Sequence, residues 1–155
     1  MAAEHIPAQF RGAVPYLYIK GAADAIEYYK KCFGAAEIIR MTDPKTGAIG
    51  HAEIKIGDAA IMLADEFPSM GVLSPKTIGG SPVTIMLYVD DVDTIVRQAV
   101  AGGAKILRPV EDQFYGDRAG KIEDPFDHTW FIATHKEDVS AEEIAKRAKA
   151  KYGMS

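Results

Sequence analysis

Residues 81–103, SPVTIMLYVDDVDTIVRQAVAGG, decide the fold of this chain. The first half of this stretch alternates between two sets of side chains, which is the pattern of a β-strand with two different faces. The second half places apolar residues three and four positions apart, from Val92 to Val100, as on one side of an amphipathic helix. Gly102 and Gly103 then end the helix. The stretch predicts a strand followed directly by a helix.

The same pattern occurs earlier in the chain. Residues 14–35 read VPYLYIKGAADAIEYYKKCFGA, in which Leu17 and Ile19 correspond to Leu87 and Val89. The spacing of about seventy residues indicates an internal repeat. Each half is too small to bury a large core alone, so we expect the two halves to pack together as one domain.

Each half also predicts the same order of elements, βαβββ. The expected strands are residues 14–19, 36–41, 50–56 and 59–64 in the first half and 83–89, 105–107, 120–123 and 129–134 in the second. We predict one domain over residues 12–137, with module one at 12–66, a linker at 67–81 and module two at 82–137, followed by a C-terminal helical tail at 138–155. Within the tail, Ser140 and Glu143 are spaced as a capping box.

Composition excludes several classes of protein. The 155 residues are 48% apolar, which is ordinary for a globular domain. A net charge of −4 does not provide the basic face that nucleic-acid binding needs. No apolar run is long enough for a membrane span, and the N-terminus lacks the pattern of a secretory signal. The lone Cys32 is expected in the core, and we expect a cytoplasmic protein with no nucleic-acid or membrane partner.

The second half contains motifs that resemble a known family. These motifs are residues 115–118 (YGDR), residues 124–128 (DPFDH), Trp130 and residues 134–140 (THKEDVS). With the duplicated βαβββ order, they resemble the vicinal oxygen chelate superfamily of glyoxalase I, bleomycin-resistance proteins and extradiol dioxygenases, and more closely its PhnB-like branch. Asp127 departs from the family turn, which usually has glycine at that position.

The resemblance implies an α+β fold in which each module curls four strands around an open concave face, with its helix on the other side. The two modules would form a pseudo-symmetric open barrel around a cavity, and homodimers would be expected. Enzymes of the family bind a divalent metal through His, Glu or Gln on the first and last strands of each module. Here those positions fall on Val14, Thr84, Met62 and Phe131, which are not ordinary metal ligands. We therefore predict no metal and no cofactor.

One other group of residues could bind a metal. His51 and Glu53 share a strand face because strand side chains alternate, and His128 or His135 could complete a site. The alternative is that His51 and Glu53 are polar lining of the sheet, and that His128 supports its turn.

Strand alternation also predicts what lines the concave face. Aromatic and thioether side chains dominate it, which suits an apolar organic ligand, although such side chains can also simply fill the core. In the loop expected at residues 110–118, Arg118 either holds an anionic ligand or pairs with Asp117. The predicted ligand-binding residues are Tyr16, Tyr18, His51, Glu53, Met62, Met86, Tyr88, Tyr115, Arg118 and Phe131.

Three functions remain open on this basis. The first is a metal-free protein that binds a small apolar or aromatic molecule. The second is an enzyme of lyase, isomerase or dioxygenase type, with a relocated metal or with His51 and Glu53 as acid–base groups. The third is a homodimer that binds no ligand.

Overall fold

The computed structural model describes residues 2–153, which divide into two compact units, the first ending at Ser81 and the second beginning at Pro82. The first unit contains η1 (Ala8–Phe10), β1 (Tyr16–Ile19), α1 (Ala22–Phe33), β2 (Ala36–Thr42), β3 (Ile49–Ile56), β4 (Ala59–Asp65), η2 (Pro68–Met70) and α2 (Pro75–Ile78). The second contains β5 (Thr84–Tyr88), α3 (Val92–Ala101), β6 (Lys105–Asp112), β7 (Asp117–Glu123), β8 (Thr129–His135) and α4 (Ala141–Tyr152).

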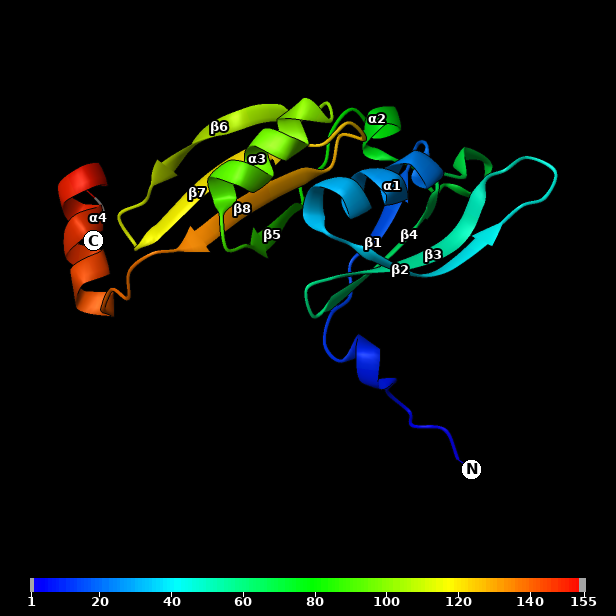
Figure 1. The fold of residues 1–155 in the computed structure, drawn as a ribbon, viewed down its shortest axis with the longest axis horizontal. Helices are drawn as coiled ribbons and strands as arrows, with labels where there is room; N and C mark the ends of the chain where they lie inside the picture. Colours follow the sequence, from blue (N-terminus) through cyan, green and yellow to red (C-terminus); the bar gives the residue numbers. More distant parts are fainter. Residues whose placement is uncertain (1, 154–155) are drawn as a thin grey trace. The chain divides into compact units, whose positions relative to one another are not determined.

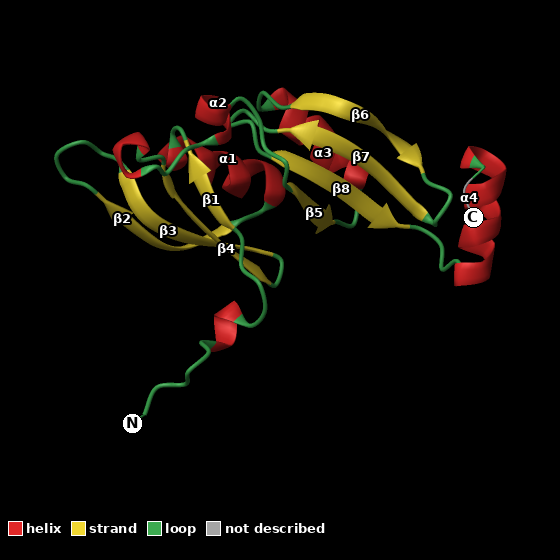
Figure 2. Cartoon of the chain, turned by 180° about the vertical axis from the view of Figure 1, so that it is seen from behind, coloured by secondary structure: helices red, strands yellow, loops and turns green. Residues whose placement is uncertain are grey.

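Each unit has one four-stranded sheet. Figures 1 and 2 show both sheets as open rather than closed. The strand order is β1-β4-β3-β2 in the first unit and β5-β8-β7-β6 in the second. β1 is parallel to β4, and β5 is parallel to β8. All other neighbouring strands in the two sheets are antiparallel. The duplicated α+β fold, with its open sheets and C-terminal helix, is confirmed.

Helices α1 and α3 cover one face of their sheets because the strands alternate as the sequence predicts. In β1, Leu17 and Ile19 are buried beneath α1, while Tyr16 and Tyr18 are exposed on the other face. On α1, the residues buried in the same core include Ala22, Ile26, Tyr29, Cys32 and Phe33. The apolar side chains buried on one face of β1 thus form the core with α1, and the opposite face of this strand is exposed.

In each unit a side chain near the end of the last strand of the βαβββ module, β4 or β8, binds the backbone at the start of the helix, α1 or α3. Asp65 accepts hydrogen bonds from the backbone N–H groups of Gly21 and Ala22, at 3.1 and 2.8 Å, and from that of Ile49 at 2.7 Å. In the second unit Thr134 accepts from the N–H of Val92 at 2.8 Å and donates to the carbonyl of Val89, just after β5. Both side chains satisfy donors that a helix N-terminus leaves unpaired.

The prediction of a loop over residues 110–118 was wrong. β6 continues to Asp112 and β7 begins at Asp117, so residues 113–116 alone connect them. Pro109 and the charged residues of this segment have low strand propensity, but β6 is an edge strand, where proline and charge are tolerated. Pairing with β7 therefore overrides the local propensity.

Helix α4 begins where the capping pattern predicts. The Ser140 hydroxyl accepts from the N–H of Glu143 at 3.2 Å. Arg147 holds the helix against the connection between β6 and β7 through the Phe114 carbonyl, and against the segment after β8 through the Glu137 carboxylate. Among residues 2–153, no helix has both the length and the apolar character that a bilayer span requires.

Candidate functional site

The open face of the first unit carries two neighbouring tyrosines. Tyr16 and Tyr18 are 39% and 38% exposed, and their ring centroids lie 5.1 Å apart. Met62, on β4, is the strand partner of Tyr16 and of Glu53 on β3, so it lies between them on the sheet. The structure therefore brings together five of the predicted binding residues, because His51 shares this face with Glu53.

A hydrogen-bonded chain crosses this face. The Tyr16 hydroxyl lies 2.8 Å from Nδ1 of His51, and Nε2 of His51 lies 3.1 Å from Oε1 of Glu53. Burial is the main cause that raises the pKa of Tyr16, followed by the charges of Tyr18 and Glu53. Tyr16 therefore keeps its proton at neutral pH and can donate it to His51.

The open face of the second unit has a similar apolar surface. Met86 and Tyr88 on β5 are 43% and 57% exposed, and Met86 pairs with Phe131 on β8. A surface hollow of about 350 Å³ at the end of β5 is lined by Tyr88, Val89, Asp90, Thr134 and His135. The Tyr88 ring therefore lies exposed at the edge of this hollow.

Asp117 organises the polar end of this second face. Its side chain is 4% exposed and accepts a hydrogen bond from the Tyr88 hydroxyl at 2.7 Å. Nδ1 of His135 lies 2.7 Å from the other oxygen of Asp117, and Nε2 of His135 lies 2.7 Å from Asp138. The hydrogen bonds with Asp117 and then Asp138 raise the pKa of His135, which favours the imidazolium.

Sequence reasoning missed Asp117 as part of this face, because the segment was expected to be a loop without alternation. Tyr115, a predicted binding residue, lies in the short connection that precedes Asp117, and its ring packs edge-on against Phe114. Burial and the nearby Asp117 raise the pKa of Tyr115. Its phenol therefore stays neutral beside the carboxylate.

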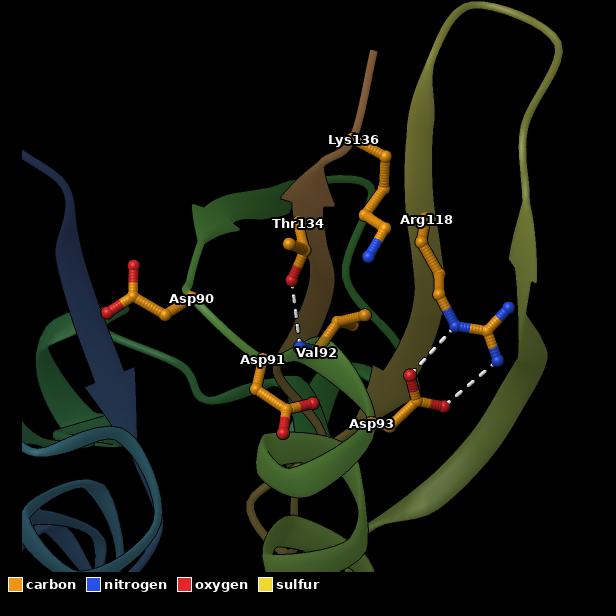
Figure 3. A pocket seen from close by; sticks show the side chains of 7 residues that line it. All are labelled: Asp90, Asp91, Val92, Asp93, Arg118, Thr134 and Lys136. Atoms are coloured by element: carbon orange, nitrogen blue, oxygen red, sulfur yellow. Dashed lines mark hydrogen bonds and ion pairs between the residues drawn. The ribbon is translucent and has the colours of Figure 1, made fainter.

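Arg118 lies on the opposite face from the other predicted binding residues of this unit. It is on β7 beside Thr134, whose side chain faces α3, and it forms a two-pronged ion pair with Asp93 on that helix at 2.8 and 3.0 Å (Figure 3). It also reaches Asp112 at 3.2 Å. Pairing with Asp117, one of the two alternatives considered for Arg118, does not form, because alternation along β7 turns consecutive side chains to opposite faces.

This ion pair borders a second hollow, of about 320 Å³, at the start of α3, which shares Asp90 and Thr134 with the first. Figure 3 shows the residues that line it. The ion pair lowers the pKa of Asp93 and raises that of Arg118. The guanidinium is thus held by two carboxylates, which satisfies its charge without an anionic ligand.

The turn before β8 is structural. The buried Asp124 carboxylate accepts from the backbone N–H groups of Phe126 and His128, and from Nε1 of Trp130 at 2.9 Å. Trp130 is 1% exposed, and its side chain is held within the core. His128 is buried in the same turn, as the structural interpretation of this residue predicts.

The metal positions of the family lack suitable donors in this chain. Thr84, Met62 and Phe131 occupy three of these positions and offer a hydroxyl, a thioether and a hydrocarbon group. Their strand partners, Thr129, Tyr16 and Met86, add only hydroxyl and thioether groups. Among residues 2–153, no group of three or more His, Cys, Asp or Glu side chains is arranged to hold a metal ion. The residues present do not fit the divalent metal of the family.

Comparison with known proteins places this geometry in a wider context. The model of the Glyoxalase/Bleomycin resistance protein/Dioxygenase superfamily matches residues 11–132. The uncharacterized protein Mb0911c of Mycobacterium bovis is 39% identical over 133 residues, which are 84% of this chain and 87% of that protein.

Solved structures agree with the fold. The PhnB protein of Bacillus cereus aligns with a TM-score of 0.65 and 14% identity, over 80% of this chain and 99% of that one. FosX of Listeria monocytogenes, a fosfomycin resistance protein solved with Mn(II) and sulfate, aligns with a TM-score of 0.59 and 14% identity, over 85% and 94%. At these identities the likeness concerns the fold alone.

Proposed function

Because the chain belongs to the glyoxalase/bleomycin resistance protein/dioxygenase superfamily, we propose that it binds a small, planar, largely apolar organic molecule on the open faces of its sheets, without a metal. The observation that carries this proposal is the exposure of Tyr16, Tyr18, Met86 and Tyr88 on the faces opposite the helices. Large aromatic and thioether side chains exposed together on one face are typical of binding surfaces.

The polar groups of these faces suit a ligand with few hydrogen-bonding atoms. In each unit one tyrosine hydroxyl lies at the margin of the apolar surface. The hydroxyl of Tyr16 is hydrogen-bonded to His51, and that of Tyr88 is hydrogen-bonded to Asp117. These contacts orient the phenols, while their rings remain available for stacking. The ligand would therefore gain most of its binding free energy from apolar contact and its orientation from one or two polar atoms.

A binding screen tests this proposal. We expect at least one planar aromatic compound from a broad panel to raise the melting temperature of the protein. Met86→Ser should then weaken the binding of that compound by about fivefold, because apolar contact area is lost. The loss should appear in calorimetric titrations as a higher dissociation constant.

Ile106 provides the matched control for Met86. It is 53% exposed, but its strand partner is the buried Ile122, which places it on the helix-bearing face. Ile106→Ser should leave the affinity unchanged. Equal effects of the two substitutions, or no stabilising compound in the panel, would contradict the proposal.

A second candidate function is acid–base catalysis in the first unit. The observation that favours it is the hydrogen-bonded chain from Tyr16 through His51 to Glu53 on an open face. If a panel compound is turned over rather than merely bound, His51→Gln should abolish product formation, and product analysis by mass spectrometry would show this.

We also propose that the protein forms a homodimer. The edge strands β2 and β6 expose apolar side chains, among them Ile38, Met41 and Leu107 at 59%, 57% and 47%. An exposed apolar edge strand is a template for pairing with another chain, and exposed apolar patches mark interaction sites. Sedimentation at micromolar concentration should give twice the mass of one chain, and a monomer would contradict this proposal.

A further inference from the structure

The chain of hydrogen bonds on the first open face has a defined direction. A carboxylate only accepts hydrogen bonds, so Nε2 of His51 donates to Glu53 at 3.1 Å. In the neutral imidazole, Nδ1 is then an acceptor, and the hydrogen bond of 2.8 Å with Tyr16 must use the phenolic proton. Every donor in the chain thus points from Tyr16 toward Glu53.

This order matches the hydroxyl–imidazole–carboxylate arrangement in which a carboxylate holds the imidazole in one tautomer and the imidazole accepts a proton from the hydroxyl. The exposure of the side chains also follows this order. Those of His51 and Glu53 are 26% and 18% exposed, whereas Tyr16 is 39% exposed. Tyr16 is therefore the residue of the chain that a molecule on this face can reach most easily.

The second unit does not repeat this arrangement. His135 lies between the carboxylates of Asp117 and Asp138, so both of its nitrogens donate hydrogen bonds when it is charged. An imidazolium cannot accept a proton, and the Tyr88 hydroxyl donates to Asp117 instead. The network of the second unit is therefore a fixed bridge, and the network of the first unit is suited to proton transfer.

We infer that Tyr16, His51 and Glu53 form a proton relay, in which the Tyr16 oxygen is the reactive atom toward a neutral electrophilic ligand. His51 accepts the phenolic proton as the oxygen forms its bond, and Glu53 is a positioning residue that stabilises the resulting imidazolium. A neutral ligand is favoured because Glu53 places a negative charge near the apolar surface of Tyr18 and Met62. The inference rests on the proposed access of small organic molecules to this face.

Benzenesulfonyl fluoride is a suitable probe of the relay. The Tyr16 oxygen would attack the sulfur, the S–F bond would break as the O–S bond forms, the proton would pass to Nδ1 of His51, and fluoride would leave. Tyr18 is an internal comparison, since it lies on the same strand and face with almost equal exposure. We expect Tyr16 to be labelled at least about tenfold faster than Tyr18, as measured by peptide mass spectrometry.

Variants separate the roles within the relay. His51→Gln should slow labelling of Tyr16 by about 100-fold, which is the usual scale of a positioned base, and Glu53→Gln should slow it by about tenfold. Lys55→Gln is the control, because Lys55 is the next residue on the same face of β3 and lies outside the relay. Circular dichroism of each variant would establish that it is folded.

Nitrogen-15 NMR of His51 gives a readout independent of the probe. The wild-type spectrum should show the proton on Nε2, and Glu53→Gln should shift the population toward the other tautomer. A proton on Nδ1 in the wild type, or equal labelling of Tyr16 and Tyr18, would overturn the relay. Labelling of Tyr18 alone would overturn the relay and leave the proposed ligand access intact, whereas absence of labelling at both tyrosines would contradict both.

Discussion

Asp127 occupies a backbone conformation that normally requires glycine. Its φ is 67°, and among residues 2–153 no other residue except glycine has a φ in the left-handed region. The turn is closed by the hydrogen bond of 3.0 Å from the Asp127 N–H to the Asp124 carbonyl. The Asp124 carboxylate also accepts hydrogen bonds from the backbone N–H groups of Phe126 and His128, on either side of Asp127. These contacts compensate the strain of an L-residue at positive φ.

At the scale of this residue, Asp127→Gly should raise the free energy of unfolding by about 0.5–1 kcal/mol, because glycine adopts positive φ without a steric penalty. Urea denaturation of both proteins measures the change. Asp127→Ala is the control and should lower stability by about 1 kcal/mol, since alanine has a Cβ and no polar side chain to tolerate this conformation. Stabilisation by both substitutions would exclude backbone strain as the cause.

At the scale of elements, His135 joins three segments of the second unit. It lies at the end of β8, and its ring nitrogens reach Asp117 at the start of β7 and Asp138 in the connection to α4. Gly116, which precedes Asp117, accepts hydrogen bonds from the N–H groups of Lys136 and Glu137 through its carbonyl. A Cβ at Gly116 would collide with the Glu137 carbonyl oxygen, so the connection passes close to this turn.

The raised pKa of His135 predicts a pH dependence of stability. The imidazolium is stabilised in the folded state, so its contribution is complete below the ordinary imidazole pKa of about 6.5 and is lost as pH rises through the higher folded pKa. His135→Gln should therefore lower stability more near pH 6 than near pH 9. Urea denaturation of both proteins at the two pH values measures this difference.

His5 serves as the control for this titration, since it is exposed in the N-terminal arm. His5→Gln should leave the stability difference between the two pH values unchanged. A loss of stability in His135→Gln that is equal at both pH values would show that the His135 ring acts by packing rather than by charge.

At the scale of the whole molecule, the duplication preserves the role of a position while changing its chemistry. Asp65 and Thr134 occupy equivalent places near the ends of β4 and β8, and each binds the backbone at the start of its unit's helix. Asp65 accepts three backbone hydrogen bonds as a carboxylate, whereas Thr134 accepts one and donates one. Hydrogen bonds to a charged acceptor are stronger than those to a hydroxyl.

We therefore expect Asp65→Ala to cost about 2–3 kcal/mol and Thr134→Ala about 1–2 kcal/mol of unfolding free energy. Hydrogen-exchange mass spectrometry assigns each loss to a unit: Asp65→Ala should speed exchange in α1, and Thr134→Ala should speed exchange in α3. Val83→Ala is the control, because Val83 is 62% exposed and lies outside both helix starts. Faster exchange in both helices from either substitution would contradict independent capping.

The sequence by itself determined the local elements and their duplication, because alternation, helical spacing and capping residues depend on neighbours within a few positions. It also determined which residues of β1 and β5 face away from the helices, and that Cys32 belongs to the core. It did not determine the extent of β6, where proline and charge hide a strand that only pairing with β7 stabilises.

The tertiary structure alone decided the partners of the polar side chains. Tyr16 meets His51 because β1 lies beside β4, and β4 lies beside β3, although the two residues are 35 positions apart in sequence. Arg118 binds Asp93 rather than the adjacent Asp117 because neighbours on a strand face opposite ways. Such partners are set by which strands pair and in which register, and this information lies in contacts between distant segments rather than in local sequence.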